Sequence, residues 1–114
     1  MSLKISTRQT NGVAILDLSG RIVLGEESSA LREAIKELAT RGEKKVLLNL
    51  ADVNYVDSSG LGTLASGYIA IANRQGKLKL LNVAKKIHDL MKFTNLLSIF
   101  EVFDDEATAL RSFR

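Results

Sequence analysis

The chain opens with a short alternating segment that is followed by a turn. Residues 3–9 alternate apolar and polar side chains, which is typical of a strand with one exposed face. Asn11-Gly12 is a strong hairpin-turn pair, because both residues tolerate positive φ. Residues 13–18 are therefore expected to return as an antiparallel strand, with a short extension at 21–24.

Farther along, apolar residues recur every three or four positions, which predicts amphipathic helices. The expected helices span 26–41, 59–75 and 85–94, and a closing helix is capped by Asp104 and turns Ala107, Leu110 and Phe113 inward. Three apolar runs fall between them, at 46–50, 78–83 and 99–103. The first is apolar on both faces, as in a parallel strand covered by helices.

The predicted order is β-β-α-β-α-β-α-β-α, over one domain spanning residues 1–114. A hairpin followed by alternating helices and strands implies an α/β fold with a mostly parallel sheet. The N-terminal strand is expected at an antiparallel edge, and four helices flank the sheet.

Composition narrows the class of protein. The chain has 114 residues, 46% of them hydrophobic and 25% charged, and no cysteine, so a thiolate site or disulfide is excluded. The formal charge is only +3 and the basic residues are scattered along the sequence, so no nucleic-acid surface is expected. No apolar run is long enough to insert in a membrane, and Met1–Lys4 lack a signal core, so we expect a cytoplasmic location.

The most informative stretch is the junction between the strand at 46–50 and the next helix. Asp57, Ser58 and Ser59 are all good helix N-cap residues. If Asp57 is the cap, Ser58 is the first helical residue and its hydroxyl is free on an exposed turn. Gly60 and Gly62 remove side-chain bulk from the first turn, so another molecule can approach the backbone closely.

The sequence contains no recognisable catalytic or cofactor motif. The only histidine, His88, lies on a predicted helix and is expected to face solvent, and no nucleophile elbow or phosphate loop occurs. The acidic run Asp104-Asp105-Glu106 fits a helix start better than a metal site. We therefore expect no enzyme, no cofactor and no metal.

From the residues alone, two interpretations of Asp57-Ser58-Ser59-Gly60 stay open. It is either a well-capped helix start or an acceptor for a protein kinase. A phosphoryl group on Ser58 would place about −1.5 to −2 charges beside the positive end of a helix, where anions are favoured.

The run Asp57-Ser58-Ser59-Gly60-Leu61-Gly62 resembles the motif of the STAS domain, and in particular that of bacterial anti-sigma factor antagonists. The similarity extends over nearly the whole chain. It implies that Ser58 is phosphorylated by an anti-sigma factor that is itself an ATP-using serine kinase. The unphosphorylated protein would bind this kinase and free the sigma factor, and a PP2C-type phosphatase would reset it.

The same resemblance implies that Asp57 shapes the loop, that Ser59 is a polar neighbour and that Gly60, Leu61 and Gly62 take part in partner binding. Two departures from the family pattern stand out. The partner-binding segment before the first helix reads Gly20-Arg21-Ile22-Val23, so Arg21 and Val23 stand there without the usual acidic residue. The third helix ends in Thr94-Asn95-Leu96, where the family usually has glycine.

Two other functions are compatible with the sequence. In one, the chain is a permanent STAS subunit of a lipid-transport or stress-signalling assembly and is not phosphorylated. In the other, which no phosphate loop supports, it is a small nucleotide-binding or nucleotide-hydrolysing protein.

Overall fold

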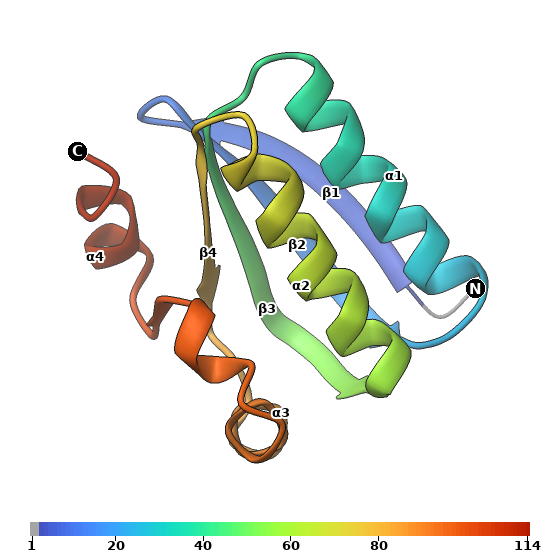
Figure 1. Ribbon diagram of the computed structural model, residues 1–114. Coiled ribbons are helices and arrows are strands. Elements are labelled where there is room, and N and C mark those ends of the chain that lie inside the picture. The colour runs from blue at the N-terminus through green and yellow to red at the C-terminus, as the bar shows by residue number, and fades with distance from the viewer. Residues whose placement is uncertain (1–2) are drawn as a thin grey trace.

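The computed structural model has an α/β fold built on a five-stranded sheet in the order β1-β2-β3-β4-β5 (Figure 1). The structure describes residues 3–114. Met1 and Ser2 lie outside the described residues, and with them part of the segment Met1–Lys4 that is expected to lack a signal core. The strands are β1 (Leu3–Thr10), β2 (Val13–Ile22), β3 (Lys45–Val56), β4 (Lys77–Leu81) and β5 (Val102–Phe103). The helices are α1 (Glu26–Thr40), α2 (Ser58–Ala72), α3 (Lys85–Phe93) and α4 (Glu106–Arg111), with a 3-10 turn, η1 (Leu97–Ile99), before β5.

The sheet topology confirms the predicted fold class. β1 pairs antiparallel with β2 at one edge, and the remaining pairs are parallel. Asn11 and Gly12 have φ values of 53° and 80° in the hairpin turn. Positive φ at both turn residues matches the twist of the two strands, so this pair sets the register of the hairpin.

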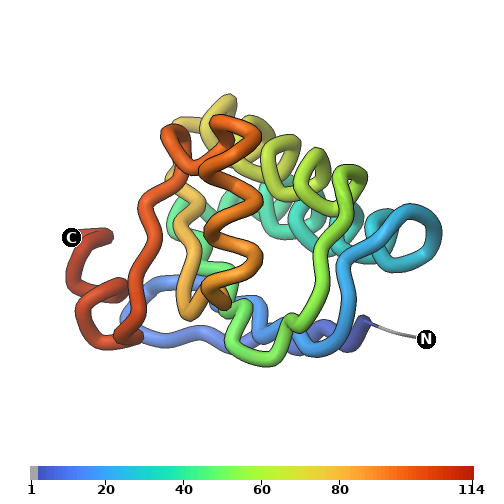
Figure 2. The backbone as a smooth tube through the Cα atoms, turned by 90° about the horizontal axis from the view of Figure 1, so that it is seen from below, coloured from blue at the N-terminus to red at the C-terminus, as the bar shows by residue number. Residues whose placement is uncertain are grey.

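The sheet has a fully covered face and a partly covered face. Alternate residues of β2 point to opposite faces, so Leu16 joins the larger core under α1, α2 and α3, whereas Ile15 joins a smaller core under α4. Figure 2 shows α1, α2 and α3 together on one side of the N-terminal strands. Because α4 has only six residues, the smaller core covers Val13 and Ile15 at the start of β2, whereas Ser19 and Arg21 farther along the strand are exposed.

The central strands are longer than predicted. β2 runs without interruption through Gly20, and β3 continues to Val56 instead of ending near residue 50. The pairing of β2 with β3 shifts register twice, between Asp17 and Ser19 and between Gly20 and Arg21. These irregularities keep the two strands together beyond the apolar run, so they end side by side at the same edge.

The C-terminal segment also departs from the prediction. Asp105, not Asp104, caps α4, because its carboxylate accepts the Thr108 amide at 2.9 Å. Ala107 is exposed and Ala109 is buried in its place. The predicted strand at 99–103 is reduced to the two residues of β5, because η1 occupies its start.

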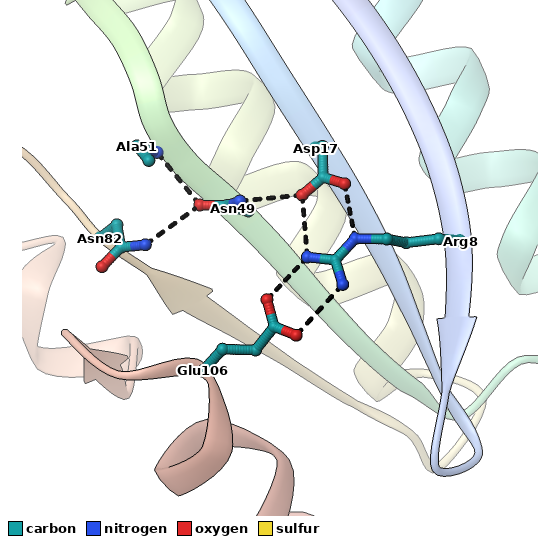
Figure 3. A network of polar contacts seen from close by, with 6 residues as sticks. All are labelled: Arg8, Asp17, Asn49, Ala51, Asn82 and Glu106. Carbon is teal, nitrogen blue, oxygen red and sulfur yellow. Dashed lines mark hydrogen bonds and ion pairs between the residues drawn. The ribbon is translucent and has the colours of Figure 1, made fainter.

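A polar network joins α4 to the open face of the sheet (Figure 3). The Arg8 guanidinium donates to Asp17 at 2.6 Å and to Glu106 at 2.6 and 3.1 Å. Asn49 donates to Asp17 at 2.8 Å and accepts from Asn82. Arg8 therefore holds the pKa of both carboxyl groups, on Asp17 and on Glu106, below their ordinary values. The network links β1, β2 and β3 to the last helix.

We predict that Glu106→Gln lowers the free energy of unfolding by less than about 1 kcal/mol at neutral pH, because the pair with Arg8 is partly exposed. The depressed pKa of Glu106 means that the charged pair stabilises the fold above about pH 4 and that this contribution is lost as pH falls through the folded pKa. Urea unfolding at pH 7 and in acid measures the difference. Glu33→Gln, at an exposed position of α1, is the control, and equal effects of the two variants at pH 7 would contradict the prediction.

Candidate functional site

The two strand ends at β2 and β3 carry the predicted site residues. Asp57 is the N-cap of α2, as predicted, and one of its carboxylate oxygens accepts the Gly60 amide at 2.7 Å. The other oxygen accepts the Leu24 amide at 3.0 Å, across to the loop after β2. The Asp57 amide in turn donates to the Ile22 carbonyl at 3.2 Å. Asp57 therefore fixes the β3–α2 junction to the β2–α1 loop.

These contacts favour the charged form of Asp57. The amides of Gly60 and Leu24 donate to the carboxylate and hold the pKa of Asp57 below its ordinary value. Capping was predictable from the sequence, whereas the link to Leu24 was not, since the two residues are 33 positions apart.

Ser58 is the first residue of α2, and its side chain is exposed. Its hydroxyl makes no hydrogen bond within residues 3–114. Ser59 is half-buried, and its carbonyl accepts the Thr63 hydroxyl at 3.1 Å. Of the two neighbouring serines, Ser58 therefore offers the hydroxyl that a large enzyme can reach.

The two glycines of the first turn have different surroundings. A Cβ atom on Gly60 would lie 2.1 Å from the Ile22 carbonyl oxygen and 2.8 Å from Val56 Cγ1, so this position needs glycine to let α2 begin against the sheet. A Cβ on Gly62 would meet nothing within 4 Å, and this residue is exposed. Gly62, not Gly60, therefore leaves room for another molecule.

The remaining predicted residues are divided between core and surface. Leu61 is 3% exposed and belongs to the larger core, so its side chain anchors α2 to the sheet. Val23 is half-buried, and its carbonyl accepts both the amide and the hydroxyl of Ser28 at the start of α1. Arg21 is exposed, with its guanidinium carbon 5.4 Å from the centre of the Tyr55 ring.

Exposed apolar side chains around Ser58 were not recognised from the sequence. Leu24 is 77% exposed, Tyr55 47% and Phe93 86%. A mostly apolar groove of about 420 Å³ lies between the end of β3 and α3; its lining residues are Asn54, Tyr55, Val56, Lys86, Ile87, Asp89, Leu90 and Phe93. The available signal was the spacing of Phe93 from the buried residues Ile87 and Met91, because it places this large ring on the side of the helix that faces away from the core.

Among residues 3–114 there is no group of three His, Cys, Asp or Glu side chains that could hold a metal. His88 is half-buried, not fully exposed as expected, and it lines a hollow together with Asn82 and Phe103. In the same part of the chain, no helix is long and apolar enough to cross a bilayer.

The chain is an α/β domain whose sheet has one antiparallel edge strand. Helix α2 begins with a serine at the carboxyl ends of two parallel strands. The STAS domain model matches residues 4–109, and the chain belongs to this family. One relative is the anti-sigma F factor antagonist of Paenibacillus polymyxa, which is 27% identical over 110 residues and covers 96% of this chain and 94% of its own.

Solved structures agree with this assignment of the fold. An anti-sigma factor antagonist from Mycobacterium paratuberculosis matches with a TM-score of 0.85 at 21% identity, over 99% of this chain and 95% of its own. The Bacillus cell fate determinant SpoIIAA in its phosphorylated form matches with a TM-score of 0.74 at 18% identity, over 96% of this chain and 99% of its own.

We predict that Asp57→Ala releases both backbone amides that the carboxylate accepts, and that Asp57→Asn releases one, because the amide side chain keeps a single acceptor oxygen. The measurement is the chemical shift of the Leu24 and Gly60 amide protons by NMR. In the unmodified protein both shifts should be constant above about pH 4 and change as pH falls through the depressed pKa of Asp57.

Asp52→Asn, on an exposed position of the same strand, is the matched control and should leave both amide shifts unchanged. Unaltered shifts in Asp57→Ala would show that Asp57 does not connect the two loops.

Proposed function

We propose that this protein is an anti-sigma factor antagonist whose binding is controlled by phosphorylation of Ser58. Unphosphorylated, it binds an anti-sigma factor that is also a serine kinase, and the sigma factor is released. Phosphorylated, it lets go, and a PP2C-type phosphatase restores the binding form. Its role is that of a binding regulator rather than an enzyme. The observation that carries the proposal is the exposed hydroxyl of Ser58 at the start of α2, which has no hydrogen-bond partner among the described residues.

The surroundings of Ser58 supply a mechanism for release. The hydrogen bond from the Leu24 amide to Asp57 holds Leu24 next to Ser58, and Tyr55 lies three residues before Ser58 in the sequence. Exposed side chains of this kind form a surface that gains free energy when a partner covers it. A phosphoryl group brings about −1.5 to −2 charges to that surface, and covering it would remove the water from a dianion.

Phosphorylation is compatible with the free protein. The first-turn amides and the positive end of α2 favour an anion at Ser58. The carboxylate of Asp57 adds a repulsive charge nearby, yet its oxygens are already engaged by two amides. The penalty of the phosphate therefore falls mainly on the complex, which is the condition for a reversible switch.

We predict that Ser58→Ala abolishes phosphorylation and keeps partner binding, whereas Ser58→Asp weakens binding by about tenfold, or about 1.4 kcal/mol. The assay incubates the purified protein with the anti-sigma factor kinase of its host and ATP, followed by intact mass measurement, site mapping and calorimetric titration. Ser59→Ala should still be phosphorylated. Phosphate that persists on Ser58→Ala would assign the acceptor elsewhere, and a protein that is never modified but stays in one complex would favour a permanent subunit.

We further predict that Phe93→Ala weakens binding of the same kinase by about 1–3 kcal/mol, because a large exposed ring beside an apolar groove is typical of an interface anchor. Ile69→Ala is the control: Ile69 is also exposed, at 54%, but lies near the other end of α2. Neither variant should change the free energy of unfolding by more than about 0.5 kcal/mol. Equal affinities for Phe93→Ala and the unmodified protein would remove the groove from the interface.

A further inference from the structure

The end of the molecule opposite Ser58 gathers basic side chains that are scattered along the sequence. The hairpin turn, the α1–β3 loop and the α2–β4 loop meet there, at the amino ends of β3 and β4 (Figure 1). Six exposed cations belong to this surface, which we call the basic end: Arg41, Lys44, Lys45, Arg74, Lys77 and Arg111. These six residues come from three stretches that are far apart in the sequence, and the fold brings them to one end of the molecule.

Hydrogen bonds between the loops hold this surface together. Lys45 and Lys77 are paired residues of neighbouring strands, and the Lys77 amide donates to the Lys44 carbonyl at 2.7 Å. The Lys44 ammonium donates to the Arg74 carbonyl, and Arg74 donates to the Ala39 carbonyl at 3.1 Å. These bonds direct two of the cations to the ends of α2 and α1, where helix dipoles favour positive charge.

The charge of the basic end is only partly compensated. Glu43 pairs with Arg41 at 3.5 Å, and Glu101 pairs with the buried Lys79 at 3.5 Å. Lys45 and Lys77 form no ion pair with any residue in the 3–114 range. Their ammonium groups therefore remain available to an anionic partner.

A hollow of about 350 Å³ opens between the hairpin turn and the C-terminal segment. Asn11, Lys45 and Arg111 contribute polar groups to its lining, and Leu110 and Phe113 contribute apolar ones. No acidic side chain lines it. A concave surface with cations and an amide at its rim suits a phosphate-bearing headgroup.

Two aromatic side chains at the basic end, Phe113 and Tyr68, are buried and half-buried, and the exposed apolar residues near it are aliphatic. Ile69 lies one turn before Asn73 at the end of α2, and Ile99 shares a hollow with Lys77. The exposed aromatic side chains, Tyr55 and Phe93, lie instead at the groove near Ser58. Aromatic platforms are what single-stranded nucleic acids stack on, whereas cations beside aliphatic side chains fit the surface of an anionic bilayer.

We infer that the basic end is a contact surface for membranes rich in anionic phospholipids. The protein would lie on the bilayer through electrostatic contacts, without insertion of a helix. In this orientation Ser58 and the apolar groove face away from the lipid, so membrane contact and partner binding do not compete.

The test is co-sedimentation of the full chain with vesicles of phosphatidylglycerol and phosphatidylcholine, compared with phosphatidylcholine alone, at low and high ionic strength. The unmodified protein should bind the anionic vesicles, and binding should fall as salt is raised. Lys45→Glu with Lys77→Glu should lower partitioning by about tenfold or more, since each basic residue at the surface contributes to it.

The matched control is Lys4→Glu with Lys92→Glu, at exposed positions outside the basic end. Each replacement changes the charge by two units, so both double variants go from +3 to −1. Thermal unfolding by circular dichroism verifies that both variants fold. Retained binding by the control and loss by Lys45→Glu with Lys77→Glu would support the inference.

Three results would overturn the inference. The unmodified protein could fail to bind anionic vesicles, or both double variants could lose vesicle binding equally. The third is that a short single-stranded oligonucleotide binds through Lys45 and Lys77 more tightly than the anionic vesicles do. The outcome is independent of Ser58. A protein that ignores vesicles can still be phosphorylated, and one that binds vesicles can lack a kinase.

Discussion

The close contact between the start of α2 and the end of β2 is the constraint on which the functional end depends. The carbonyl oxygen of Ile22 accepts the Asp57 amide and would lie only 2.1 Å from a Cβ atom on Gly60, so α2 can pack there only with glycine at this position. The Asp57 carboxylate then fixes the loop at Leu24. The Ile22 carbonyl and the Asp57 carboxylate thus fix the positions of the loop after β2 and the loop after β3. The hydroxyl of Ser58 lies on the surface that these two loops form.

The order of elements was predictable because hydrophobic spacing reports which face of each segment is buried. The lengths of β2 and β3 were not, since their last residues pair through two register shifts that leave no local pattern. A similar limit applies to α4. Asp104 and Asp105 are equally good caps by local rules, and the packing of Ala109 under the sheet selects the second.

The site was predictable where it depends on neighbouring residues and not where it depends on the fold. Helix rules allow Asp57, Ser58 or Ser59 as the cap, and the structure selects Asp57, which makes Ser58 the first helical residue. The internal role of Gly60 and the exposure of Phe93 depend on distant segments. The basic end is the clearest case, because a charge total of +3 says nothing about where a parallel sheet gathers its loops.

A switch built in this way needs no change in the fold. Since the Ser58 hydroxyl has no hydrogen-bond partner within residues 3–114, modifying it breaks no internal contact. In the free protein, water and the positive end of α2 both stabilise a phosphate at this position. In the proposed complex this water would be lost while the apolar side chains of Leu24 and Tyr55 remain, so the same charge would become costly. The free-energy difference of the proposed switch would then arise at the interface, and a rigid domain could carry the signal.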